Sequence, residues 1–115
     1  MNSKQKANIG IGKAIAYYTS IGAVVSIPLN DSQSYDLLVD FNSVISRVQV
    51  KYTSTSRVDL RSVSGSTRLV YNRLSIRSAD ILFIVGDNLW EIPVADIHQT
   101  TAIILNSDIE KYIVG

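Results

Sequence analysis

An aspartate, a glutamine and a lysine stand out in an apolar stretch, YDLLVDFNSVISRVQVKYT, which spans residues 35–53. Asp36 lies near its start, and Gln49 and Lys51 alternate with valines near its end. Carboxylate and amide oxygens are ligands for a hard divalent cation such as Mg²⁺. An ammonium group holds phosphate or stabilises negative charge that develops during a reaction. The three residue types are therefore compatible with metal-assisted chemistry on a phosphate, provided that the fold brings them together.

The hydrophobic pattern of this stretch predicts that they meet. A two-residue hairpin turn at 42–43 sets Asp36 directly opposite Gln49, and Lys51 then points to the same face, diagonal to Asp36. The other face of the hairpin collects the core candidates, which are Tyr35, Leu37, Val39, Phe41, Val44, Val48 and Val50. A slip of one residue would mix the two sets, so the pattern supports this register. A simpler interpretation stays open: a surface ion pair between Asp36 and Lys51, which contributes about 0–1 kcal/mol.

The elements that position this hairpin follow from periodicity. Apolar residues recur at three- and four-residue spacing over 4–21, which predicts a helix that ends at Gly22. Further strands are expected at 23–29, 79–86, 89–93 and 102–105, with another hairpin around Gly65. This order predicts one α+β domain over residues 1–115, with a mixed, mainly antiparallel central sheet and the N-terminal helix packed on it.

Composition narrows the possible functions. The chain has 115 residues, of which 46% are hydrophobic, and this suits one folded domain. It has no cysteine and one histidine, His98, which argues against thiol catalysis and histidine- or cysteine-based zinc sites. We find neither a membrane-length apolar run nor a signal peptide, so we expect a cytoplasmic protein with no membrane partner.

Basic residues gather on both sides of the hairpin. Residues 1–30 carry Lys4, Lys6 and Lys13 and no acid. Residues 52–79 carry Arg57, Arg61, Arg68, Arg73 and Arg77 against Asp59 alone. Such clusters are either ordinary solvated surface or contacts to a polyanion, and charge alone does not separate the two readings.

At these residues the chain resembles the PD-(D/E)xK nucleases, above all the branch found as group I intron homing endonucleases. The family pattern is an acid at the start of one strand, a hairpin, and acid-x-Lys on the next strand. Asp36, Gln49 and Lys51 match it, and glutamine is a known variant of the second acid in that branch. The stretches IGKAIAYYTSIGAVVSIPL and SADILFIVGDNLWEIP resemble the first helix and strand and the later core strands of the family.

The resemblance implies a restriction-endonuclease-like core and hydrolysis of phosphodiester bonds in double-stranded DNA. Asp36, Gln49 and Lys51 would be catalytic, and Asp36, Gln49 and the Val50 carbonyl would hold Mg²⁺ or Mn²⁺. DNA contacts are expected at Arg57, Arg61, Arg68, Arg73, Lys4, Lys6 and Lys13. Cutting both strands requires more than one copy, so we expect a homodimer or homotetramer, in a prokaryote or phage. Trp90 and Tyr112 are candidates for core packing or for the contact between copies.

One position departs from the family pattern. Many members carry a glutamate in the first helix as a further acid near the metal, and Ile11 stands where we expect it. This leaves two alternatives to an active nuclease. One is a weak or inactive DNA-binding protein on the same fold, and the other is an unrelated α+β interaction module.

Overall fold

The computed structural model describes residues 1–30, 34–60, 62–64, 70–72 and 76–115, with the backbone alone for 62–64 and 70–72. The helical elements are α1 (Ser3–Ser20) and two 3-10 helices, η1 (Val94–Asp96) and η2 (Ser107–Tyr112). The strands are β1 (Val24–Ser26), β2 (Leu37–Phe41), β3 (Val44–Tyr52), β4 (Arg57–Asp59), β5 (Ser62–Ser64), β6 (Val70–Asn72), β7 (Ile81–Val85), β8 (Leu89–Pro93), β9 (Ala102–Ile104) and β10 (Ile113–Val114).

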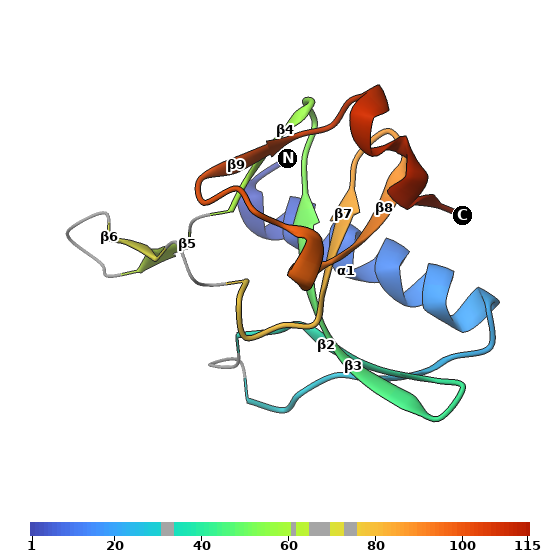
Figure 1. Ribbon diagram of the computed structural model, residues 1–115. Coiled ribbons are helices and arrows are strands. Elements are labelled where there is room, and N and C mark those ends of the chain that lie inside the picture. Colours follow the sequence, from blue (N-terminus) through green and yellow to red (C-terminus); the bar gives the residue numbers. More distant parts are fainter. Residues whose placement is uncertain (31–33, 61, 65–69, 73–75) are drawn as a thin grey trace.

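Six strands form the central sheet in the order β1-β2-β3-β7-β8-β10. The β3–β7 pair is parallel and the other pairs in this sheet are antiparallel. Helix α1 packs on one face (Figure 1), while β4 pairs with β9 and β5 with β6 outside the sheet. The predicted α+β fold, with a mainly antiparallel sheet and an N-terminal helix packed on it, is therefore confirmed.

The ends of α1 are fixed by local signals. Asn2 caps the helix through a capping box with Gln5, in which each side chain accepts from the other residue's backbone N–H. At the other end Gly22 adopts a φ of +89°, a left-handed conformation that favours glycine. The helix thus starts at Ser3 instead of residue 4 and ends at Ser20 instead of residue 21, one residue earlier at each end than predicted.

The central hairpin has the predicted register. Phe41 pairs with Val44 and Leu37 with Val48, so the turn consists of Asn42 and Ser43. These two residues have φ values of +51° and +66°, as a turn matched to the right-handed twist of the strands requires. The turn predicted around Gly65 lies outside the described residues, but the strands before and after it, β5 and β6, form an antiparallel pair that projects from the body of the protein (Figure 1).

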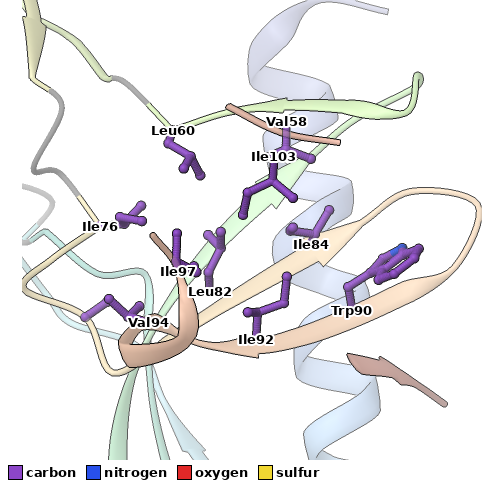
Figure 2. Packing of buried hydrophobic residues seen from close by; sticks show 11 residues of the cluster. Val58, Leu60, Ile76, Leu82, Ile84, Trp90, Ile92, Val94, Ile97 and Ile103 are labelled. Carbon is purple, nitrogen blue, oxygen red and sulfur yellow. The ribbon is translucent and has the colours of Figure 1, made fainter. Parts of the chain in front are cut away.

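Two apolar cores lie on opposite faces of the sheet. The core under α1 comprises Ala14, Tyr18, Ala23, Leu37, Val39, Val48, Phe83 and Val85. The second core is formed by the other side chains of β7 and β8 together with β4, β9 and the segments around them (Figure 2). Alternation along β7 explains the division, because Leu82 and Ile84 join the second core and Phe83 and Val85 the first.

Three predicted members of the hairpin core face are not in the core under α1. Phe41 and Val44 are 39% and 63% exposed. They flank the turn. Because β1 pairs with β2 as far as Asp40 but β7 pairs only with Val48–Tyr52, the β3 side of this end has no neighbouring strand among the described residues. Tyr35 precedes β2 and packs against the second core instead. The alternation predicted for the strand does not extend back to Tyr35.

Candidate active site

A surface cavity of about 520 Å³ lies between the first turns of α1 and the second half of β3. Its walls carry Ser3, Lys6, Ala7, Asn8 and Ile11 from the helix, and Asp36, Gln49, Val50, Lys51 and Tyr52 from the hairpin. The three polar residues of the hairpin thus reach one cavity, as the register predicted. What the structure adds is the helical wall opposite them.

Asp36 is held in place by the facing strand. Its Oδ2 accepts the backbone N–H of Val50 at 2.8 Å and the side-chain amide of Gln49 at 3.2 Å. The backbone N–H of Asp36 in turn donates to the Val48 carbonyl. Burial raises the pKa of the Asp36 carboxyl, and the Val50 N–H and the Lys51 charge only partly oppose this. The carboxylate is therefore fixed in orientation at a position that disfavours its charge.

Lys51 lies in the same cavity, and its side chain forms no hydrogen bond or ion pair with any described residue. The Arg47–Asp80 contact is an ion pair within the described part of the chain, whereas Asp36 and Lys51 do not form one. Burial lowers the pKa of the Lys51 ammonium, against the attraction of Asp36 and Asp59. The interpretation that Asp36 and Lys51 simply form a surface ion pair is therefore wrong, and the ammonium is left available to a ligand.

Two positions of α1 define its approach to the site. A Cβ at Gly10 would lie 3.4 Å from Val50 Cγ1 and 3.5 Å from Tyr52 Cβ, so glycine allows the helix to lie close to β3. Ile11 follows it and lines the cavity that contains Asp36. A glutamate at position 11 would thus border the same cavity, and the isoleucine places an apolar side chain there.

The predicted DNA-contact residues are distributed unevenly. Lys6 is half-buried and lines the cavity, whereas Lys4 is exposed on α1 outside it. Lys13 borders a different hollow, which Gly86 and Gly115 also line. Arg57 is exposed at the start of β4. The remaining three predicted contacts, Arg61, Arg68 and Arg73, lie outside the residues whose side chains are described.

Other residues of the cavity wall were not predicted. Ser3, Ala7 and Asn8 line it from the helix, and Tyr52 from β3. The four-residue spacing of Ser3, Ala7 and Ile11 would have indicated a shared helix face, but the sequence does not state which face meets the hairpin. Asp59 was also missed: it is an acid close enough to raise the pKa of Lys51.

Outside the cavity, Trp90 and Arg77 have structural roles. Trp90 is 5% exposed and belongs to the second core, so it is not available as a contact between copies. The guanidinium of Arg77 donates to the carbonyls of Val94 and Ile97 and ties the segment before β7 to η1. His98 is exposed.

The donor set fits one hard cation. Around the cavity the described residues supply the Asp36 carboxylate and the amides of Gln49 and Asn8, with the backbone carbonyl of Val50 nearby. No group of three or more histidine, cysteine or acidic side chains that could hold a metal occurs among the described residues. Mg²⁺ usually takes one or two carboxylates and completes its shell with water and substrate phosphate, which this set allows.

Comparisons with known proteins agree with the geometry. A search of curated proteins gave no match. No helix of the described residues is long and apolar enough to cross a membrane. Among solved structures, the bacterial homing endonuclease I-Ssp6803I matches with a TM-score of 0.81 and 25% identity, over 93% of this chain and 80% of that one. Residues 1–106 match the family model of the PD-(D/E)XK endonucleases. The chain belongs to the PD-(D/E)XK endonuclease family.

Proposed function

We propose that this protein is a metal-dependent endonuclease that hydrolyses phosphodiester bonds in double-stranded DNA, as a site-specific enzyme of the homing type. The observation that carries the proposal is the convergence of Asp36, Gln49 and Lys51 in one cavity, with the Asp36 carboxylate fixed by two hydrogen bonds. Membership of the endonuclease family and the likeness to a bacterial homing endonuclease support it.

Each residue of the proposed site has a distinct task. Asp36, Gln49 and the Val50 carbonyl would hold Mg²⁺ or Mn²⁺, and a cation bound there would polarise the phosphate and the attacking water. Gln49 and the Val50 N–H hold the Asp36 carboxylate in position. Lys51 Nζ faces the reacting phosphate and stabilises the negative charge that develops on it. Because burial lowers its pKa, Nζ is also better suited than a solvated lysine to exchange a proton with the attacking water.

DNA would be held by the basic residues around the cavity. Lys6 lies in the cavity wall, and Lys4 lies near it in the same N-terminal part of α1. We assign phosphate contacts to these two, to Lys13 and to Arg57. We also assign DNA contacts to Arg61, Arg68 and Arg73, which lie outside the described residues. Their neighbours in sequence, β5 and β6, form a projecting two-stranded antiparallel pair (Figure 1), and β-ribbons can enter a DNA groove.

The test is cleavage of a pool of plasmids that carry random duplex inserts, with Mg²⁺ or Mn²⁺, followed by sequencing of the ends. We expect cuts at a restricted set of sequences, and no cuts by Asp36→Asn or Lys51→Met. Asp40→Asn is the matched control, because Asp40 is an exposed acid of the same hairpin that does not line the cavity. Metal-independent cleavage, or full activity of Asp36→Asn, would contradict the proposal.

A second candidate function is supported by Ile11. An apolar side chain takes a place in the cavity wall where a further acid would strengthen metal binding. A protein that binds DNA but cuts it weakly or not at all fits this feature. Ile11→Glu separates the two candidates: a variant that cuts where the wild type only binds DNA identifies the wild type as the weak or inactive form.

We further propose that the protein acts as a homodimer or homotetramer. One cavity cuts one strand, and a pair of copies related by two-fold symmetry cuts both. Val24 on the outer strand and Ile45 at the adjoining hairpin tip are 65% and 66% exposed in one cross-strand row, and Val44 is 63% exposed on the opposite face. We take these exposed apolar side chains as candidates for the contact between copies. Light scattering coupled to size-exclusion chromatography tests this, with Val44→Lys and Ile45→Lys expected to reduce the mass. Because the similar solved structure is bacterial, we assign the activity to the cytoplasm of a prokaryote or of a phage-infected cell.

A further inference from the structure

The cavity wall contains an excess of positive charge. The described residues give it three charged side chains, Lys6, Asp36 and Lys51, which are two cations and one anion when all three are ionised. In a nuclease site with two divalent cations, carboxylates and the substrate phosphate together offset four positive charges. Among the described residues this cavity supplies one carboxylate toward that balance and already contains two ammonium groups.

The two lysines differ in how their charge is balanced. Lys51 is attracted by Asp36 and by Asp59. Lys6 forms no ion pair with any acid of the described residues, and the part of α1 before it contains no acid. Its backbone N–H donates to the Asn2 carbonyl, and no described residue contacts its ammonium in a hydrogen bond or ion pair. Within the described part of the chain, Lys6 is therefore the cation of the cavity that no acid balances.

Lys6 comes from the wall that also carries Ile11. Both residues belong to α1 and border the same cavity, opposite the Asp36 and Gln49 side. An acid at position 11 would have neutralised Lys6 or attracted a second metal ion. The isoleucine does neither, so the helical wall offers a phosphate group a fixed positive charge.

Building on the proposed nuclease function, we propose that the cavity accepts a single divalent cation and that the Lys6 ammonium supplies the second positive charge facing the DNA phosphate. Asp36 and Gln49 bind the metal ion on the hairpin side of the cavity. Lys6 binds and positions the phosphate on the helix side. The scissile phosphate then lies between the metal ion bound by the hairpin and the Lys6 ammonium of α1.

Counting bound metal ions tests the first half without any need for cleavage. Mn²⁺ titrated into the wild type and followed by electron paramagnetic resonance should reach one ion per chain, and Asp36→Asn should bind none. Lys6→Met removes a repulsive charge from the cavity and should bind Mn²⁺ about threefold more tightly. Lys111→Met is the matched control, because Lys111 is exposed on η2 and does not line the cavity, and it should leave Mn²⁺ affinity unchanged. Two ions per wild-type chain, or unchanged affinity in Lys6→Met, would overturn the proposal.

Binding of a 16-base-pair duplex of generic sequence, followed by fluorescence anisotropy in EDTA, tests the second half. Lys6→Met should weaken binding about tenfold and reduce the salt dependence by about one phosphate contact, while Lys6→Arg and Lys111→Met retain wild-type binding. Equal binding by wild type and Lys6→Met would refute the phosphate role. If metal and DNA binding behave as expected but no plasmid is cut, the nuclease proposal fails and the assignment of Lys6 stands.

Discussion

Replacing Lys51 by methionine should stabilise the protein while abolishing its activity. The pKa of Lys51 is lowered because burial outweighs the attraction of Asp36 and Asp59. Its charge is therefore a net cost to folding at neutral pH, and methionine fills similar space without charge. Each pKa unit of lowering corresponds to about 1.4 kcal/mol, so a larger lowering gives a larger gain in unfolding free energy, to which the packing of the methionine adds its own part. Loss of the ammonium should lower the cleavage rate by about 10²–10³-fold, as for other groups that stabilise a charged transition state.

The pH dependence of this gain has a definite sign. Between its lowered folded pKa and its ordinary value of 10.5, Lys51 holds fewer protons in the folded state than in the unfolded state. Wild-type stability therefore rises with pH through that window relative to Lys51→Met. The unfolding free energy of Lys51→Met should exceed that of the wild type most at neutral pH, and this difference should shrink as the pH rises above the ordinary pKa of lysine.

Urea unfolding in EDTA at a series of pH values measures both effects, with Lys111→Met as the control for loss of an exposed lysine. A Lys51→Met variant that is less stable than wild type at neutral pH would refute the reasoning, because burial would then not dominate at this site. A stability difference that grows with pH would refute it as well.

Three further substitutions test the scaffold, each by urea or acid unfolding. Tyr18→Phe removes a 2.6 Å hydrogen bond to the partly buried Glu91 carboxylate and should cost about 1.5–3 kcal/mol, and no loss would show that water replaces it. The Arg47 backbone N–H and side chain lower the pKa of Asp80. The Asp80 carboxylate therefore stabilises the fold above its ordinary pKa, and this stabilisation is lost as the pH falls through the lowered, folded-state pKa. Asp80→Asn should therefore cost up to about 1 kcal/mol at neutral pH and nothing in strong acid, since the pair is half-exposed. Gly12→Ala should stabilise α1 by about 0.5–1 kcal/mol because nothing lies within 4 Å of the added Cβ, and destabilisation would indicate an unrecognised contact.

The hairpin was predictable because its determinants are local. A polar two-residue turn and period-two alternation fix the register of β2 and β3, and that register sets Asp36 beside Gln49 and Val50. The expectation failed only for the ends of the hairpin, where burial depends on other elements. Exposure of Phe41 and Val44 depends on where β7 stops along β3, and the two strands are far apart in sequence.

The helical wall of the site was not predictable for the same reason. Lys6, Asn8 and Ile11 reach the cavity because α1 approaches β3 closely at Gly10. Periodicity shows which helix residues share a face, but the crossing of helix and sheet is a tertiary property. The two glycines illustrate this: they look alike in sequence, yet only Gly10 lies against the sheet.

Family membership and activity are separate conclusions for this chain. The fold follows from the family, but catalysis depends on particular side chains, and Ile11 is where this chain departs from the pattern we expected. The electrostatics of the cavity bear on the proposed activity. Burial raises the pKa of Asp36 and lowers that of Lys51, so the charged form of each is disfavoured, and the two do not form an ion pair that would offset this. The two charges in one cavity are thus not explained by stability. A cation bound at Asp36 and a phosphate bound at Lys51, as we propose, would favour both charged forms.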